Sequence, residues 1–394
     1  MATSIGIGFS QHKDSLTAAQ EAAQQAKEQL KKERIDFAIL LNTPHYAPEE
    51  ILPIIFKTLD QTKVIGSSTV AIILNDQVET RGVGILAFHS DNILFETAAI
   101  SHLDLQDIQE AGQLFGQNSI IDWGERHRKA FLFFADGSLT DISGLTAGLK
   151  EKLGHFFTIA GAGSTGDFHF QRNIQYHRDA YFSKSAVGVQ LGGKPILAIS
   201  GKHGWKPLGK PRTITSCQKN IIQTIDHQSA FSLYREYFNK DAEALKFNRL
   251  GQINVRYPLG IFRNTKEEYL LRNIVQVLDD ESIVCQDSIE KDSTVHIMLG
   301  NRETCLQAVE QAALELKEQL KLQKPSVIIV LESILRYKLL GRAVLEELKS
   351  IQRIIGEDIP IFGMYSHGEI FPTKSEHHIE TIANNGSAIL MAIG

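Results

Sequence analysis

Two segments, each with glycines at the positions of a turn, carry the residue types best suited to binding a charged small molecule. Residues 161–167 read GAGSTGD and residues 363–369 read GMYSHGE, so both follow the pattern G-x-x-S-x-G-acid. Glycines permit positive φ angles and a close approach of the backbone. Consecutive N–H groups and a hydroxyl can then converge on an anion, while Asp167 or Glu369 can pair with an ammonium group. The pattern indicates a ligand carrying both charges. The alternative is a strand-to-hairpin turn whose glycines serve backbone geometry alone.

A third segment repeats the pattern in a weaker form. Residues 64–73, VIGSSTVAII, keep Gly66 and Thr69 but have Ala71 and Ile72 where the other two have a glycine and an acid. Each of the three segments is followed by a strand-like run of small residues, VGILAF, VGVQL or SAILMA. Self-similarity on this scale indicates duplicated units.

The second segment also resembles two motifs of enzymes. Gly161 to Gly166 fits the spacing GxGxxG of dinucleotide-binding proteins, and Ser164 lies in a sequence similar to a nucleophile elbow. Both motifs require a helix directly after the turn, but DFHFQRNIQYH has no helical stripe of apolar residues. The sequence therefore favours neither. A hydrolase or transferase that acts through Ser164, with one of the fourteen histidines as its base, remains the alternative function.

Two arginines stand where a carboxylate clamp is plausible. Arg272 lies in the strand-like run EEYLLRNI, and Arg336 follows the apolar run VIIVLES. An arginine near a strand end suits a carboxylate because the guanidinium fork matches two oxygens. The alternative for each is a salt bridge to one of the many acids. The polar segment around His367 and His377 lacks HExxH or any other metal-ligand spacing, so no metal is predicted.

The elements that must position these residues alternate between strands and helices. Apolar runs such as FAILL at 37–41 alternate with helical stripes, and this order implies parallel strands covered by helices. Further β-rich runs imply antiparallel hairpins. We predict an α/β fold of two related domains, residues 1–212 and 213–394. Each domain is expected to be a mixed β-sheet built from βαβ units, with appended antiparallel hairpins and helices packed on the sheet. Between them, residues 192–211 are expected to form loops and a hinge, and 219–238 a helix.

Composition and charge exclude several classes of protein. The chain has 394 residues, with 41 basic and 46 acidic side chains and no basic block, which argues against nucleic acid as a partner. Three widely spaced cysteines exclude a disulfide framework and a zinc finger and indicate a reduced compartment. The N-terminus lacks the features of a signal peptide. No apolar run is long enough to span a membrane. We therefore expect a cytoplasmic protein.

Taken in order along the chain, these motifs resemble the FIST family (F-box and intracellular signal transduction). ERIDFAILLNTPHY, VIGSSTVAI and the block from GAGSTGD to AVGVQL are similar to its N-terminal half. YPLGI, EEYLLRNI, ESILRYKLLG and IFGMYSHGEIFP are similar to its C-terminal half. The resemblance implies a cytoplasmic sensory module that binds a small ligand, with an amino acid as the leading candidate. It brings no catalytic residues and no cofactor. Because the two halves use up the chain, it also implies a stand-alone protein that signals through a separate partner protein.

The sequence thus predicts a small-molecule-binding sensor with no catalytic residue, metal or cofactor, and it favours a binding protein over an enzyme. A scaffold for partner proteins is a third possibility. The predicted ligand-binding residues come from the two full turns and the two arginines: Ser164, Thr165, Gly166, Asp167, Arg272, Arg336, Tyr365, His367, Gly368 and Glu369.

Overall fold

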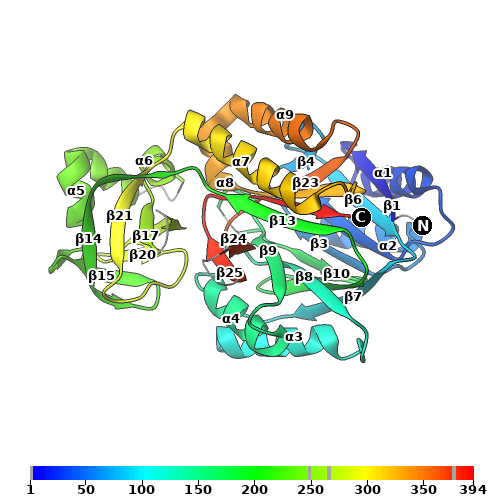
Figure 1. Ribbon diagram of the computed structural model, residues 1–394, viewed down its shortest axis with the longest axis horizontal. Helices are drawn as coiled ribbons and strands as arrows, with labels where there is room; N and C mark the ends of the chain where they lie inside the picture. Colours follow the sequence, from blue (N-terminus) through cyan, green and yellow to red (C-terminus); the bar gives the residue numbers. More distant parts are fainter. Residues whose placement is uncertain (1–2, 170, 247–249, 264–267, 375–378) are drawn as a thin grey trace.

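The computed structural model describes residues 3–169, 171–246, 250–263, 268–374 and 379–394. It has a large body on the right of Figure 1 and a smaller lobe on the left. The body contains three six-stranded sheets, and the lobe is built on a fourth sheet of eight strands. The predicted class is confirmed: the protein is α/β, with mixed sheets built from βαβ units and antiparallel hairpins.

The three sheets of the body follow one plan. The first sheet has the order β1 (Ser4–Ser10), β6 (Val83–His89), β2 (Phe37–Asn42), β3 (Val64–Ser68), β10 (Gln175–His177), β11 (Ala180–Phe182). The second has the order β7 (Ile93–Ile100), β12 (Ala186–Gly193), β8 (Arg128–Ala135), β9 (Thr158–Gly163), β24 (Glu369–Lys374), β25 (Ile379–Asn384). The third has the order β13 (Leu197–Lys202), β26 (Ala388–Ile393), β22 (Val327–Ser333), β23 (Ile361–Ser366), β4 (Ile72–Leu74), β5 (Gln77–Glu79).

In each sheet the last two strands come from a different repeat. Hairpin β4–β5 of the first repeat pairs with β23 of the third, and β10–β11 of the second repeat pairs with β3 of the first. Hairpin β24–β25 of the third repeat pairs with β9 of the second and closes the cycle. The sequence repeat therefore corresponds to three structural units, each of which completes the sheet of another. The boundary predicted at 212/213 falls inside a strand of the lobe, β14 (Lys206–Gln218). The division of the chain into two domains at this point stays a prediction.

Apolar side chains place the helices and the core. The three sheets of the body turn one face inward and contribute to one shared cluster that includes Phe37, Phe134 and Phe362. The outer faces are covered by helices, two or three to a sheet. In chain order these are α1 (Ser15–Leu30), α2 (Pro48–Thr58), α3 (Ile108–Ile120), α4 (Ile142–Leu153), α7 (Arg302–Leu320), α8 (Ile334–Leu340) and α9 (Val344–Ile355). Helix α1 packs on its sheet through buried alanines, among them Ala19, Ala23 and Ala26, whereas Leu16 in its first turn is exposed, and Asp14 caps the helix by accepting from Thr17 N.

The lobe is inserted between β13 and α7 of the third repeat. Its strands, in sheet order, are β18 (Tyr269–Arg272), β17 (Leu259–Phe262), β21 (Thr294–Leu299), β14, β15 (Ile221–Ile225), β20 (Ile283–Cys285) and β19 (Ile274–Val277), and β16 (Gln228–Ser229) pairs with β15. Helices α5 (Ser232–Phe238) and α6 (Gln252–Arg256) and the 3₁₀ segment Asn239–Lys246 complete it. Its own core includes Phe231, Tyr234 and Ile283.

Two local expectations for the middle of the chain are wrong. Residues 219–238 form strands β15 and β16 before the short helix α5, and the expected hinge at 192–211 contains β13 and the start of β14. Strand β15 pairs with both β14 and β20. Pairing with strands distant in sequence decides this region, and a local apolar pattern does not contain that information.

A glycine in the middle of the second parallel strand is required in each repeat. Gly66 lies opposite Leu40, Gly161 opposite Phe133 and Gly363 opposite Val330. A Cβ atom on Gly363 would lie 2.1 Å from the Val330 carbonyl oxygen, and one on Gly66 would lie 2.2 Å from the corresponding oxygen of Leu40. These glycines serve the close approach of two parallel strands.

We predict that Gly363→Ala lowers the free energy of unfolding by about 2–3 kcal/mol, because the methyl group forces two strands of the core apart. Chemical denaturation followed by circular dichroism measures the loss. Gly84→Ala is the control, since its Cβ would meet only side-chain atoms, at 3.2 Å or more. A loss for Gly363→Ala no larger than for the control would contradict the explanation.

Candidate ligand-binding site

The three repeat turns meet at one buried point in the body. The Tyr365 carbonyl accepts hydrogen bonds from Thr165 Oγ1 at 2.7 Å and from Thr69 Oγ1 at 2.8 Å. Val70 N donates to Thr165 Oγ1 at 3.1 Å. Thr69, Thr165 and Tyr365 are fully buried. The turns therefore lie side by side, as the paired-turn hypothesis requires, but Thr165 and the Tyr365 carbonyl are used to join the repeats.

Ser164 is buried in a chain of neutral hydrogen bonds. Its Oγ accepts from Gln175 Nε2 at 2.8 Å and from Gly137 N at 3.3 Å, and Gln175 Oε1 accepts from Ser185 Oγ at 2.8 Å. Within the described residues, none of these hydrogen-bond partners of Ser164 is a histidine or a carboxylate. A serine nucleophile needs an adjacent base, so the geometry around Ser164 gives no support to the alternative of a hydrolase.

The last two residues of the second turn, Gly166 and Asp167, contact the chain that follows the turn. Gly166 has φ +29°, and a Cβ atom there would lie 2.0 Å from the Arg172 carbonyl oxygen. Asp167 Oδ1 accepts from His169 N and Gln171 N, both at 3.0 Å. This carboxylate therefore organises the chain that follows it.

The third turn holds a carboxylate deep in the protein. Glu369 is fully buried, and its Oε1 accepts from Ser366 Oγ at 2.9 Å and from Gly368 N at 3.1 Å. Its Oε2 accepts from Ser387 N at 3.0 Å. Burial raises the pKa of Glu369 to about 8, although these donors act in the opposite direction. The group is therefore poised to titrate near neutral pH.

Next to Glu369, the third turn contacts both the second repeat and the lobe. His367 Nδ1 lies 2.8 Å from the Gly137 carbonyl oxygen and 2.9 Å from Gln286 Nε2. Gly368 has φ +93°, and a Cβ atom there would lie 3.0 Å from Gln286 Nε2 and 3.9 Å from Asn385 Nδ2. His367 and Gly368 thus form the body side of a polar contact with the lobe.

Amide side chains form the lobe side of this contact. Asn273 N donates to Asn385 Oδ1 at 3.0 Å, and Gln286 N donates to the Asn273 carbonyl at 2.9 Å. Asn273 is 0% and Gln286 2% exposed, yet both side-chain polar atoms of Asn273 and Oε1 of Gln286 lack a hydrogen-bond partner among the described residues. A buried polar atom in this state costs about 1–3 kcal/mol. A ligand group with a donor and an acceptor matches these atoms.

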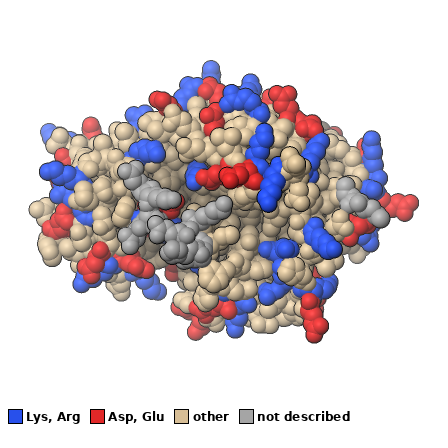
Figure 2. Space-filling view, viewed as in Figure 1, with Lys and Arg blue, Asp and Glu red and all other residues tan. Residues whose placement is uncertain are grey.

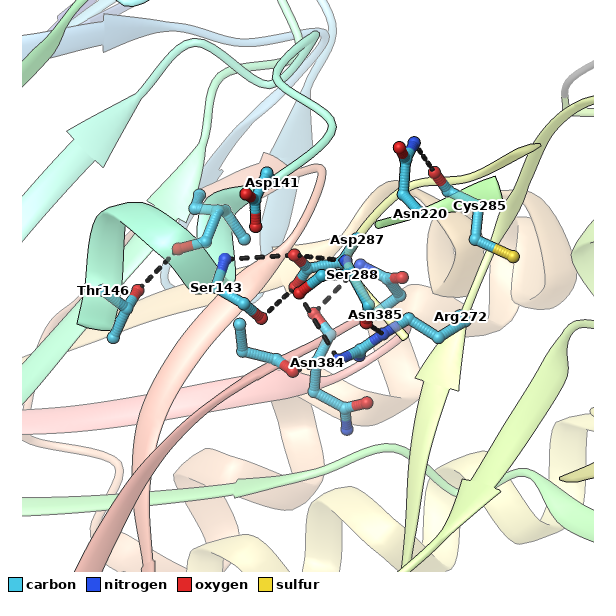
Figure 3. Close-up of polar contacts among 12 residues, drawn as sticks. Asp141, Ser143, Thr146, Asn220, Arg272, Cys285, Asp287, Ser288, Asn384 and Asn385 are labelled. Atoms are coloured by element: carbon cyan, nitrogen blue, oxygen red, sulfur yellow. Dashed lines mark hydrogen bonds and ion pairs between the residues drawn. The ribbon is translucent and has the colours of Figure 1, made fainter. Parts of the chain in front are cut away.

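The neighbours of these amides in sequence form a charged pair, shown in Figure 3. Arg272 Nη2 lies 3.8 Å from Asp287 Oδ2, and both side chains are buried. Asp287 accepts from Ser143 N at 3.0 Å and from Ser143 Oγ at 2.6 Å, so a lobe carboxylate caps the body helix α4. Arg272 donates through Nε and Nη1 to backbone carbonyls, among them Ala383 O at 3.2 Å. The pair therefore ties the lobe to the body.

A second carboxylate at the start of α4 adds to the negative charge at this point. Asp141 Oδ1 accepts from Gly144 N at 2.9 Å and caps the helix from its own chain. Burial raises the pKa of Asp141, and the negative charge of Asp287 raises it further. A cationic group of a ligand would be stabilised beside these two acids.

A cleft opens beside Arg272 at the junction of lobe and body. This junction cleft has a volume of about 190 Å³. Its lining includes Ser143, Thr146, Ala147 and Lys150 of α4 with Arg272 and Ala383. Arg272 therefore borders the cleft directly, and Ser143, which also lines it, contacts Asp287. Figure 2 shows basic and acidic side chains interspersed over one face of the molecule.

Arg336, the other predicted clamp, lies in a separate buried cluster. It contacts Glu332 Oε1 at 3.3 Å and also Glu347, and it donates to the carbonyls of His203 at 2.6 Å and Cys305 at 2.9 Å. Burial raises the pKa of Glu332 to about 7. These contacts hold α7, α8 and α9 on their sheet. Tyr365 is adjacent: its hydroxyl is buried without a hydrogen-bond partner among the described residues.

The structure thus divides the ten predicted site residues. Arg272, His367, Gly368 and Glu369 gather where the third turn meets the lobe, whereas the others serve the turns and the Arg336 cluster. Sequence reasoning missed a set of polar residues that completes this place: Ser143, Asn273, Gln286, Asp287 and Asn385. The adjacent pairs RN at 272–273 and QD at 286–287 follow strand-like runs, and this was the available signal.

The described residues hold no candidate for two other kinds of site. Among the described residues, no group of three or more His, Cys, Asp or Glu side chains is arranged to hold a metal ion. Within that same part of the chain, no helix combines the length and the apolar character needed to cross a membrane.

Comparison with known proteins gives a consistent family match and weak structural matches. The family model of the FIST N domain matches residues 36–228 of this chain, and the family model of the FIST C domain matches residues 230–372. No curated protein matches. A crystal structure of a chorismatase is 8% identical, with 100% of this chain and 99% of that one covered and a TM-score of 0.36. Phosphoribosylformylglycinamidine synthase II of Thermotoga maritima is 9% identical, with 99% and 72% covered and a TM-score of 0.23. TM-scores this low support no conclusion about the chemistry of this protein.

We predict that Asn273→Leu raises the free energy of unfolding of the protein without ligand by about 1–2 kcal/mol. The substitution removes two buried polar atoms that lack partners and keeps the shape of the side chain. Thermal melting measures the gain. Asn254→Leu is the matched control: this buried amide donates to the Ile274 carbonyl and accepts from Ile274 N at 3.2 Å, so its loss is expected to destabilise the protein. Destabilisation by both substitutions would show that the Asn273 amide is satisfied.

We also predict a pH dependence that Glu369→Gln reduces. In the unfolded chain the carboxyl group has its ordinary pKa of 4.5, and in the folded chain its pKa is about 8. Between these values the folded state holds more protons, so the free energy of unfolding falls as the pH rises. Melting temperatures from pH 5 to 8 test this. Glu332 contributes in the same direction in both proteins, so the variant keeps a shallower decline. Equal slopes for the two proteins would contradict the assignment.

Proposed function

Because the chain belongs to the FIST family of sensory domains, we propose that it senses a small polar metabolite bound where the lobe meets the body. We call this place the junction site and define it by Ser143, Arg272, Asn273, Gln286 and Asp287. The observation that carries the proposal is the charged pair of Arg272 and Asp287, which is buried beside an open cleft.

The geometry of this pair suits a ligand with one positive and one negative group. The two charges are 3.8 Å apart, longer than the 2.7–2.9 Å typical of a charge-assisted hydrogen bond. Among the described contacts of Arg272, Nη2 has only this one, while Nε and Nη1 are held by carbonyls. A carboxylate can therefore bind Nη2, and an ammonium group can bind Asp287. An amino acid has both groups and is the leading candidate.

Binding at this place would be transmitted through the contact between lobe and body. Asp287 of the lobe caps α4 of the body through Ser143, so a ligand that engages Asp287 changes this contact. We propose that a separate signalling protein recognises the resulting change in the position of the lobe.

The proposed compartment is the cytoplasm. It is supported by the three cysteines, which are all unpaired in the structure; Cys285 and Cys305 are buried. Burial also raises the pKa of Cys285 to about 12, which keeps this thiol protonated and inert.

The test is a thermal-melting screen of the twenty amino acids. We expect at least one to raise the melting temperature, and at 100 times its dissociation constant the added stability is about 2.7 kcal/mol. Asp287→Asn weakens the ammonium contact and Arg272→Lys removes the fork, so each should abolish the shift. Arg302→Lys, on the exposed surface and outside the cleft, should preserve it.

A variant that leaves the charged pair intact tests whether loss of the melting-temperature shift comes from misfolding. Ala147 lies on the surface of α4 and lines the junction cleft, so Ala147→Phe should block the cleft and abolish the shift while the helix persists. The proposal fails if no amino acid stabilises the protein. It also fails if stabilisation survives both Ala147→Phe and Asp287→Asn.

A further inference from the structure

Strand β1 is a free edge of the first sheet. It pairs with β6 in an antiparallel register from Ser4 to Ser10, and among the described residues no strand pairs with its other side. In an antiparallel ladder, alternate residues direct their N–H and C=O groups away from the partner strand. An edge strand therefore presents a row of backbone groups to which a strand of another molecule can add.

The sequence of β1 lacks the usual protections of an edge strand. Proteins commonly protect such a strand with a lysine, a proline or a β-bulge. Strand β1 reads SIGIGFS, with no charged residue and no proline, and its register with β6 contains no bulge. Any protection of this edge must therefore come from outside the strand.

Two glutamines of helix α1 occupy outer backbone donors of β1. Phe9 N donates to Gln25 Oε1 at 3.1 Å, and Ile7 N donates to Gln29 Oε1. The spacings of the two elements match, because two residues along a strand span about 6.8 Å and four residues along a helix span about 6 Å. Both glutamines are exposed. Their contacts therefore lie at the surface that an incoming strand would approach.

Small residues bring the helix close enough for these contacts. A Cβ atom on Gly6 would lie 2.0 Å from the Ala26 carbonyl oxygen, and one on Gly8 would lie 1.8 Å from the Ala22 carbonyl oxygen. Ala22 and Ala26 are fully buried. Helix α1 therefore lies directly on the strand, and the two glutamines, each three residues after one of these alanines, reach its edge.

The other two sheets of the body have a similar contact at a free edge. Gln319 of α7 holds the edge strand β13: its Oε1 accepts from Ile199 N at 3.2 Å, and its Nε2 donates to the Ile199 carbonyl at 2.9 Å. Asn118 of α3 holds the edge strand β7, since its Nδ2 donates to the Ala99 carbonyl at 3.3 Å. An amide side chain from a covering helix thus contacts an edge strand in all three repeats.

We propose that Gln25 and Gln29 form an edge guard: they occupy the backbone donors of β1 at which a second copy of this chain would otherwise add a strand. The added strand would be β1 of that copy, because an uncharged edge can pair antiparallel with its own copy about a two-fold axis. Loss of the guard therefore favours a dimer joined through β1. This inference concerns the first sheet and does not rest on the junction site.

Sedimentation velocity over a range of protein concentrations tests the proposal. Gln25→Ala with Gln29→Ala removes both acceptors, and because alanine favours the helix, this guard variant should fold. Gln20→Ala with Gln24→Ala is the matched control: these glutamines are also exposed on α1 four residues apart, and their described hydrogen bonds are with side chains of α1 and α2. We expect the association constant of the guard variant to be at least tenfold larger than that of the wild type, and the control to match the wild type.

Hydrogen exchange of residues 4–10 locates the contact. In dilute solution the amides of Ile7 and Phe9 should exchange faster in the guard variant than in the wild type, because their acceptors are gone. Where the variant associates, both amides should be protected again by the second strand. Gln25→Glu with Gln29→Glu keeps both acceptors and should keep the slow exchange. The inference is overturned if the guard variant associates no more strongly than the control, if the two amides exchange at the wild-type rate, or if association leaves them unprotected.

Discussion

The structure depends on the exchange of hairpins among three repeats. No repeat completes its own sheet: each sheet is extended by a hairpin of another repeat, and the exchange brings the three turns together. At the meeting point one carbonyl, that of Tyr365, accepts hydrogen bonds from threonines of the other two turns. A strand that ends in such a buried place must satisfy its backbone groups there, which explains why the turns carry hydroxyl groups. The glycine opposite the neighbouring strand in all three repeats allows the two strands to approach closely.

The insertion of the lobe sets the third turn apart from the other two. The lobe is inserted in the third repeat and packs against the third turn, so Gly368 faces Gln286 and Asn385. The second turn has the same pattern, but its serine is held by Gln175 and its acid by the following backbone. The first turn has neither the second glycine nor the acid. A shared motif therefore serves the fold in all three repeats, and the lobe adds polar partners to one.

Local pattern in the sequence was sufficient for single strands and helices of the body, but not for the exchange of hairpins among its sheets or for the lobe. Strands such as Phe37–Asn42 are buried on both faces and read as continuous apolar runs. The helix expected at 219–238 failed because distant strands decide that region. Likewise, Ser164 looked available for chemistry because a sequence shows neither Gln175 nor the depth of burial. Asn273 and Gln286 carry no motif, and only the pairing of their strands brings them to Gly368.

Buried polar groups without a hydrogen-bond partner occur at several places among the described residues, and the junction between lobe and body holds one set of them. Elsewhere in the core a buried charge such as Arg336 is surrounded by two carboxylates and two carbonyls, an arrangement that holds helices in place. At the junction, the side-chain atoms of Asn273 and Oε1 of Gln286 lack partners among the described residues, one charged pair is loose, and Glu369 is buried with only neutral donors described. Each feature lowers stability by itself. We propose that at the junction a ligand, and not the fold, supplies the missing interactions.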